Sequence, residues 1–213
     1  MAKIKICGLT REQDIYAVNE FLPDYAGFVF AKSRRKLTCP RAVELITILN
    51  PTIKPVGVFV NNDPGELTDI AKACNLAAVQ LHGDEDNHYI DNLRKLLPEG
   101  TLVIKAVRVK SREILETASA IECDIFLLDS FQEGVAGGTG DTFDWTLLKD
   151  FTRPYFLAGG LNKNNVTIAV QMLHPFGIDV SSGVETDGLK DSNKILAFIK
   201  KARESITRSN IRT

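Results

Sequence analysis

Short apolar runs alternate with stretches able to form a helix along the whole chain, and this alternation limits the possible folds more than any other feature. The runs are rich in β-branched residues, as strands usually are. The run at 55–60 is almost wholly apolar, which is expected of a parallel strand covered on both faces. The runs begin near Lys3, Tyr25, Pro55, Ala77, Leu102, Asp124, Pro154 and Phe176.

Eight strand–helix units in a chain of 213 residues fit one compact α/β barrel. The sequence therefore predicts a single-domain (βα)8 TIM barrel over residues 1–213. An open, doubly wound sheet would show the same alternation and is the alternative fold. Helix starts are indicated by a capping-box pattern at 10–13 and by prolines at 40 and 64. Asn162 or Asp191 can cap a later helix.

The charge pattern argues against nucleic-acid and membrane partners. Acidic and basic residues are interspersed, and the formal net charge is −1. The chain enters its first strand at once, so neither a signal peptide nor a membrane span is expected. The cysteines at 7, 39, 74 and 123 have neither zinc-ligand spacing nor the spacing of a disulfide framework. These features predict a cytoplasmic protein.

Two expected strand ends carry a possible base and a possible acid. The first strand ends at Cys7 and the sixth at Asp129. Because the carboxyl ends of all barrel strands meet on one face, a thiol and a carboxyl this far apart in sequence can share a pocket. Cys7 taken alone would more often be a small buried hydrophobic residue.

Glycine-rich segments after the seventh and eighth expected strands predict a phosphate site. Glycines let backbone N–H groups approach an anion closely, and barrels commonly bind phosphate at these two loops. Two tight turns without a ligand are the alternative interpretation. A further glycine-rich segment at 134–140 could close over the same site or act as a plain linker. The residues expected to bind phosphate are Gly138, Gly159, Gly160, Ser182 and Gly183.

These motifs resemble those of the phosphoribosylanthranilate isomerase family. The matches occur in the family's order between residues 3 and 191, so the resemblance covers essentially the whole chain. One departure follows the second expected strand, where the family's Ser-Pro-Arg reads Ser33-Arg34-Arg35. The matching segments are KICGLT at 5–10, QLHG at 80–83, LD at 128–129, GTG at 138–140, FDW at 143–145, LAGGL at 157–161 and DVSSGVE at 179–185.

The resemblance implies an aldose–ketose isomerase of tryptophan biosynthesis. Its Amadori rearrangement converts N-(5-phosphoribosyl)anthranilate to 1-(2-carboxyphenylamino)-1-deoxyribulose 5-phosphate. Asp129 matches the family's general acid, which protonates the ring oxygen, and Cys7 matches the general base, which removes the C2 proton. Neither step needs a metal or an organic cofactor, so none is expected. The expected partner is a small phosphoribosyl substrate, with the chain acting as a monomer or weak homodimer.

The resemblance also implies substrate contacts. Arg35 aligns with the arginine that meets the anthranilate carboxylate, and a guanidinium fork suits a carboxylate. Arg34 competes for this role because the missing proline leaves the loop less constrained. His82 is expected to add a polar contact, and Asp179 either orients a substrate hydroxyl or caps its own loop.

The proposed chemistry requires two pKa values to move apart. Asp129 must be shielded enough to hold a proton near pH 7, which requires its pKa to rise. The N-terminus of the first helix would lower the pKa of Cys7.

Other readings make different predictions. A histidine-pathway aldose isomerase would carry an aspartate in place of Cys7. A metal-dependent epimerase would need histidines and carboxylates at several strand ends, and His82 is the only histidine so placed. A non-catalytic phosphosugar-binding barrel would not need both Cys7 and Asp129.

Overall fold

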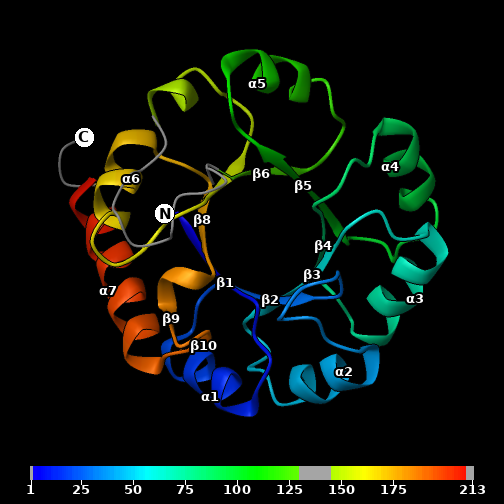
Figure 1. Ribbon diagram of the computed structural model, residues 1–213, viewed down its shortest axis with the longest axis horizontal. Helices are drawn as coiled ribbons and strands as arrows, with labels where there is room; N and C mark the ends of the chain where they lie inside the picture. The colour runs from blue at the N-terminus through cyan, green and yellow to red at the C-terminus, as the bar shows by residue number, and fades with distance from the viewer. Residues whose placement is uncertain (1, 130–144, 210–213) are drawn as a thin grey trace.

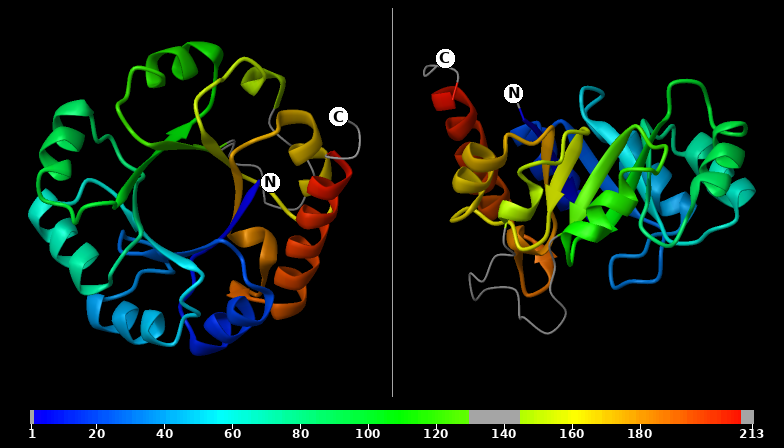
Figure 2. Two further views of the ribbon diagram at one scale, coloured as in Figure 1. Left: turned by 180° about the vertical axis from the view of Figure 1, so that it is seen from behind. Right: turned by 90° about the horizontal axis from the view of Figure 1, so that it is seen from above.

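The strands of the computed structural model close into a barrel surrounded by helices (Figures 1 and 2). The structure describes residues 2–129 and 145–209. Strands β1–β8 pair in sequence order, every pair is parallel, and β8 returns to β1. The ring leaves no open edge between β1 and β8, so the (βα)8 barrel is confirmed and the open sheet is excluded.

The elements follow the predicted alternation, and each barrel strand begins within one residue of its expected start. The strands are β1 (Lys3–Cys7), β2 (Tyr25–Val29), β3 (Lys54–Phe59), β4 (Ala78–Leu81), β5 (Leu102–Arg108), β6 (Ile125–Asp129), β7 (Tyr155–Ala158) and β8 (Gly177–Val180). The helices are α1 (Glu12–Phe21), α2 (Cys39–Thr47), α3 (Pro64–Ala73), α4 (Asn87–Arg94), α5 (Arg112–Ala118), α6 (Val166–Leu173) and α7 (Ser192–Ser209).

Smaller elements lie at the carboxyl end of the barrel strands and between β6 and β7. A short hairpin, β9 (Glu185–Thr186) and β10 (Leu189–Lys190), follows the single turn η2 (Ser182–Val184) after β8 (Figure 1). In the described residues between β6 and β7 there is a 3₁₀ turn, η1 (Trp145–Leu148), where the sequence predicted a full helix.

The predicted helix starts are confirmed in part. Pro40 lies in the first turn of α2, and Asp63 caps α3 by accepting N–H groups of the first turn. Asp191 caps α7 through the N–H of Lys194. Asn162 does not cap α6, because that helix starts later, with Asn165 at its N-cap position.

The capping box of α1 lies one residue later than predicted. The helix begins at Glu12, and the Asp14 carboxylate accepts the backbone N–H groups of Thr10 and Arg11 at 2.9 and 3.0 Å. Asp14, and not Gln13, completes the capping box, because its carboxylate accepts from two N–H groups at once. It is also paired with the Arg11 guanidinium.

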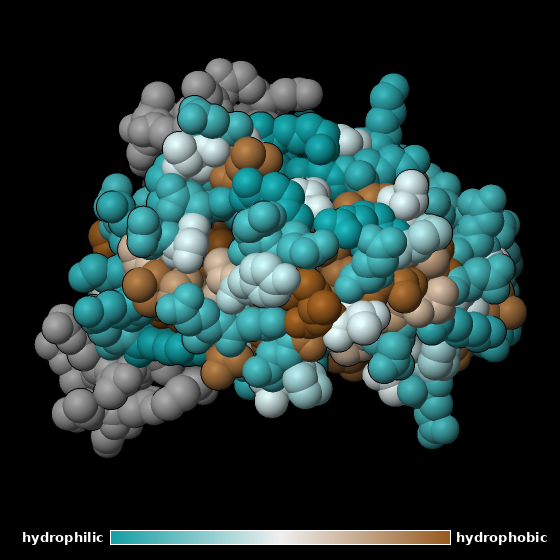
Figure 3. Space-filling model, turned by 90° about the horizontal axis from the view of Figure 1, so that it is seen from below, coloured by the Kyte–Doolittle hydropathy of each residue, from teal (hydrophilic) through white to brown (hydrophobic). Residues whose placement is uncertain are grey.

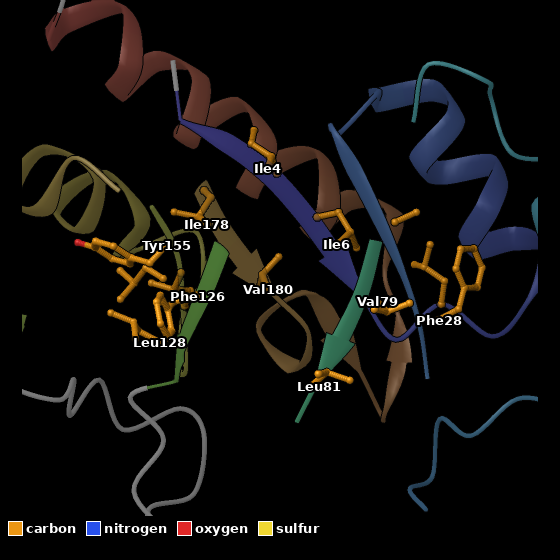
Figure 4. Close-up of a cluster of buried hydrophobic side chains, with 14 of the residues drawn as sticks. Ile4, Ile6, Phe28, Val79, Leu81, Phe126, Leu128, Tyr155, Ile178 and Val180 are labelled. Atoms are coloured by element: carbon orange, nitrogen blue, oxygen red, sulfur yellow. The ribbon is translucent and has the colours of Figure 1, made fainter. Parts of the chain in front are cut away.

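Side-chain alternation divides the core into two layers. One set of strand side chains, with the helices, forms the larger hydrophobic cluster outside the barrel wall (Figure 4). The other set points into the barrel, because successive side chains of a strand lie on opposite faces of the sheet. Residues paired across parallel strands share a face, so the inward side chains of neighbouring strands meet. The inward cluster consists of Tyr25, Val56, Ala78, Ile104, Ala106, Ile125, Leu127, Phe156 and Ala158.

Three polar residues share this inward register. Lys5 pairs with both Tyr25 and Asp179, and Gln80 pairs with Ile104. Lys5 is fully buried, and Gln80 and Asp179 are nearly so. The inward face is therefore polar on β1, β4 and β8, where the strands approach the mouth of the barrel.

On the face of the molecule seen in Figure 3, hydrophilic side chains predominate, with hydrophobic ones interspersed among them. Among the described helices, none combines the length and the apolar character that crossing a membrane requires.

A buried ion pair fixes the loop after β4. Lys105 on β5 donates to Glu85 at 2.8 Å and to the carbonyl of Gly83 at 2.6 Å. Glu85 also accepts the N–H groups of Asn61 and Gly83. Removing one partner of such a pair leaves a charge buried without compensation, which is strongly destabilising.

We expect Glu85→Ala to lower the free energy of unfolding by about 3–5 kcal/mol, because the Lys105 ammonium group and two backbone N–H groups lose their acceptor. The matched control is Glu44→Ala, which breaks the exposed pair with Arg41 and should cost less than about 0.5 kcal/mol. Urea denaturation measures both values. Equal, small losses would show that the buried pair does not hold this loop.

Candidate active site

A cavity of about 290 Å³ opens at the carboxyl ends of the barrel strands. Every predicted site residue in the described part of the chain lines it; Gly138 and the rest of segment 134–140 lie outside the described residues. The residues concerned are Cys7, Arg35, His82, Asp129, Gly159, Gly160, Asp179, Ser182 and Gly183.

A larger hollow, of about 1010 Å³, lies between α4 and α5. It shares His82 with the mouth cavity, but its lining includes neither Cys7 nor Asp129. We assign the site to the smaller cavity, because that is where the thiol and the carboxyl meet the glycine-rich loops.

Cys7 and Asp129 both reach the cavity from the ends of their strands. Each is the last residue of its strand and has the inward orientation of the interior set. Gly27 on β2 makes room for the thiol, because a Cβ there would come within 2.7 Å of the Cys7 sulfur. The Asp129 side chain is 20% exposed, so it reaches the cavity while most of it is shielded.

The pKa of Cys7 moves in the direction opposite to the one predicted. Burial raises the pKa of the thiol, and the nearby cation Lys5 opposes that rise without cancelling it. Lys190 also acts to lower it, whereas Asp179 adds to the increase. The sequence prediction considered the start of α1 and missed desolvation, which dominates at a residue that is 7% exposed.

Lys5 holds a charged network beneath the thiol. Its ammonium group donates to Asp179 at 3.0 Å and to the amide oxygen of Gln80 at 2.9 Å. Burial acts to lower the pKa of Lys5, but Asp179 and Cys7 outweigh it, so the pKa lies above its ordinary value and the group stays charged. Asp179, predicted to orient a hydroxyl or cap its loop, is thus also the counter-ion of Lys5.

His82 lies between this network and Asp129. Its Nδ1 is 3.0 Å from the Gln80 amide nitrogen, and its Nε2 is 3.8 Å from an Asp129 carboxylate oxygen. Burial lowers the pKa of His82, although Asp129 acts to raise it. The ring is therefore neutral near pH 7.

Glu185 anchors the two arginines of the β2 loop. Arg35 donates to it through Nε at 2.8 Å and Nη2 at 2.9 Å, and Arg34 also pairs with it. Lys190 donates to the same carboxylate at 2.7 Å. Burial acts to raise the pKa of Glu185, but the hydrogen bonds from Arg35 and Lys190 prevail and the pKa lies below its ordinary value.

The two arginines differ in placement. Arg35 lines the cavity and its side chain is 21% exposed, whereas the Arg34 side chain is 57% exposed and does not line it. A guanidinium has five N–H donors, so Arg35 keeps donors beyond the two that Glu185 takes.

The glycine loop after β7 has a backbone that other residues rarely adopt. Gly159 and Gly160 have φ angles of 86° and 63°. The side-chain amides of Asn162 and Asn165 donate to the Gly160 carbonyl, which fixes the turn. In the adjoining loop after β8, a Cβ on Gly183 would lie 1.9 Å from the Leu161 carbonyl oxygen, so only glycine lets these two loops approach.

Comparison with known proteins decides the family. The family model for N-(5'-phosphoribosyl)anthranilate (PRA) isomerase matches residues 4–201. The N-(5'-phosphoribosyl)anthranilate isomerase of Acetivibrio thermocellus is 49% identical over 212 residues, which cover 96% of this chain and 97% of the relative. The chain belongs to the phosphoribosylanthranilate isomerase family. Because the relatives are isomerases, the prediction of an isomerase is confirmed.

Solved structures of phosphoribosylanthranilate isomerases have the same fold. The crystal structure from Thermotoga maritima has a TM-score of 0.86 at 40% identity, covering 96% of this chain and all of that chain. Another phosphoribosylanthranilate isomerase, in complex with reduced 1-(o-carboxyphenylamino)-1-deoxyribulose 5-phosphate, has a TM-score of 0.83 at 38% identity, covering 96% of this chain and 100% of that chain.

Four polar residues around the site of this phosphoribosylanthranilate isomerase family member were not predicted from the sequence. Lys5 and Gln80 stand two positions before Cys7 and His82, so the strand period of two already placed them on the same inward face. Glu185 and Lys190 had no comparable signal, because the hairpin that brings them to Arg35 forms only in the folded chain. In the described residues no group of three or more histidines, cysteines or carboxylates is arranged to hold a metal ion.

Proposed function

We propose that this chain catalyses the Amadori rearrangement of N-(5-phosphoribosyl)anthranilate to 1-(2-carboxyphenylamino)-1-deoxyribulose 5-phosphate, in tryptophan biosynthesis. The observation that carries the proposal is the convergence of a thiol, a carboxyl, an arginine and two glycine-rich loops on one cavity, in a member of this family. The related structure that holds a reduced product analogue supports a phosphoribosyl ligand of this size.

The first step opens the sugar ring. Asp129, as general acid, gives its proton to the ring oxygen, the bond from that oxygen to C1 breaks, and the nitrogen lone pair forms an iminium. This role requires that the Asp129 carboxyl carries a proton when the substrate is bound. Asp129 ends the step as a carboxylate.

The second step removes the C2 proton. The Cys7 thiolate takes it, the C2 electrons flow to the iminium, and the resulting enolamine tautomerises to the ketone. A thiol whose pKa is raised by burial is a stronger base once it is ionised. Lys5 and Lys190 favour the thiolate, because each acts to lower the pKa of Cys7.

The two anionic groups of the substrate, a carboxylate and a phosphate, bind at separate parts of the cavity. Arg35, held by Glu185 at the edge of the cavity, meets the anthranilate carboxylate. The glycine loops after β7 and β8 receive the phosphate through backbone N–H groups. His82 and Asp179 complete the polar lining between the two ends.

The reaction only moves protons and rearranges bonds within one molecule, so it requires neither a redox partner nor a metal. We propose that the enzyme works without cofactors, in the cytoplasm, as a monomer or weak homodimer. Another phosphosugar isomerase or a non-catalytic phosphosugar-binding barrel is the alternative. Loss of substrate fluorescence when purified protein meets freshly generated phosphoribosylanthranilate tests the activity directly, and no loss would reject it.

We expect Cys7→Ala and Asp129→Asn each to lower kcat by about 10²–10⁴, because each removes one of the two proton-transfer groups. Cys123→Ala is the matched control, since Cys123 is another buried cysteine but does not line the cavity. Steady-state kinetics on variants with unchanged circular dichroism measures the effect. Near-normal kcat in either site variant would remove that residue from the mechanism.

We expect Arg35→Met to lower kcat/KM by an amount equivalent to about 1.5–3 kcal/mol, the range for a hydrogen bond to a charged group. Arg34→Met, which also removes a partner of Glu185, should cost less than about 0.5 kcal/mol because Arg34 is mostly exposed. Kinetics with both variants compares them. If Arg34 is the costly residue, the family alignment of this loop is shifted by one position.

We expect Gly160→Ala to raise KM by about tenfold with a smaller change in kcat, because its methyl group enters the open space expected to receive phosphate. The matched control is Gly100→Ala, at the other end of the barrel. Gly100 also has a positive φ, 81°, and open space around a Cβ. Inorganic phosphate should compete with substrate in the control and weakly in the variant; equal KM values in both would count against this phosphate site.

A further inference from the structure

We propose that Gln80, oriented by Lys5, is a positioning residue that holds His82 in the tautomer with its proton on Nε2, so that an N–H donor faces Asp129. The residues come from three strands that do not pair with one another, β1, β4 and β6, and their side chains approach one another inside the barrel. The proposal rests on the proposed function for the role of Asp129 as the acid.

The orientation of the Gln80 amide follows from its neighbour. A lysine ammonium group carries three donors and no acceptor, so it can face the amide only at the oxygen. Lys5 lies 2.9 Å from Gln80 Oε1. Both side chains are buried, at 0% and 1% exposure, so a flipped amide would bury an N–H₂ group against an ammonium group.

The tautomer of His82 follows from the orientation of the amide. Because Gln80 Oε1 accepts the hydrogen bond from Lys5, the Gln80 group that faces His82 is the N–H₂ donor. Its nitrogen lies 3.0 Å from Nδ1. Nδ1 must therefore offer a lone pair. Burial lowers the pKa of His82, so the ring is neutral and its single proton lies on Nε2.

The Nε2–H group matters when Asp129 ionises. Nε2 lies 3.8 Å from the nearer Asp129 oxygen, too far for a direct hydrogen bond but close enough for its dipole to act on a forming carboxylate. The opposite tautomer would turn a lone pair toward that negative charge. In this step the Asp129 O–H bond breaks and the bond from hydrogen to the ring oxygen forms, while His82 keeps its proton.

The first test reads the tautomer in the unmodified protein. The chain has three histidines, so ¹⁵N spectra of histidine-labelled protein can be assigned with His88→Gln and His174→Gln variants. We expect a neutral His82 ring at pH 7 with its proton on Nε2. A proton on Nδ1, or a charged ring, overturns the proposal without touching the proposed function, which the activity assay tests separately.

The second test moves the proton. In Gln80→Glu a carboxylate replaces the N–H₂ donor, so at a pH where the ¹⁵N shifts show a neutral ring the proton should move to Nδ1. There we expect kcat to fall at least about tenfold, with KM changed by less than about twofold, as loss of an oriented donor does. If this variant does not fold or its ring stays charged, Gln80→Met should lower kcat in the same way.

The matched control changes an amide to an acid beside another histidine. Asn92 Nδ2 lies 3.1 Å from His88 Nε2 on the exposed side of α4. Asn92→Asp should leave kcat and KM unchanged. A shifted proton with unchanged kcat in the Gln80 variant, or unchanged kcat in Gln80→Met, would overturn the positioning role.

Discussion

The buried ammonium group of Lys5 is the charge on which the arrangement of this site depends. It is fully enclosed, and it bonds to Asp179 and Gln80 from opposite sides of the barrel interior. A cation in such a place is stable only when paired, so the two acceptors cannot move independently of it. Through Asp179 it reaches β8 and through Gln80 it reaches His82, while its field favours the thiolate of Cys7. One inward-pointing lysine thus connects the surroundings of the proposed base, Cys7, with those of the proposed acid, Asp129.

The sequence predicts the barrel well because strand burial depends on local composition. Each run of apolar, β-branched residues is long enough to cross the barrel once, and the structure begins each strand within a residue of its predicted start. The placement of Cys7 and Asp129 follows from the same rule, since each ends a strand and strand ends converge. Helix starts are less certain. At α1, one additional carboxylate, Asp14, shifts the first turn by a residue.

Features that depend on long-range contacts could not be read from the sequence. Glu185 meets Arg34 and Arg35 across 150 residues of chain, and nothing local marks it as their partner. The pKa of Cys7 was predicted in the wrong direction for a related reason. The start of a neighbouring helix is visible in sequence, but the depth of burial that outweighs it is not. Local pattern therefore predicts which residues reach the site, and only packing determines their electrostatics.

The charges around the cavity are consistent with the proposed substrate, which has two anionic ends. The Lys5–Asp179 and Lys105–Glu85 pairs are each neutral and hold the interior and the β4 loop. By contrast, the single carboxylate of Glu185 faces three cations, Arg34, Arg35 and Lys190, and leaves an excess of positive charge on one side of the mouth. That side adjoins the glycine loop after β8, because Lys190 also donates to the Ser181 carbonyl. Glu185 therefore acts in two ways: it fixes the direction of the Arg35 fork, and it moderates the field so that three like charges can lie together. This excess of positive charge would favour the carboxylate and the phosphate of the proposed substrate. Cys7 lies beside it, since Lys190 acts to lower the pKa of the thiol, whereas Asp129 ends β6, which is not adjacent to β1 in the barrel.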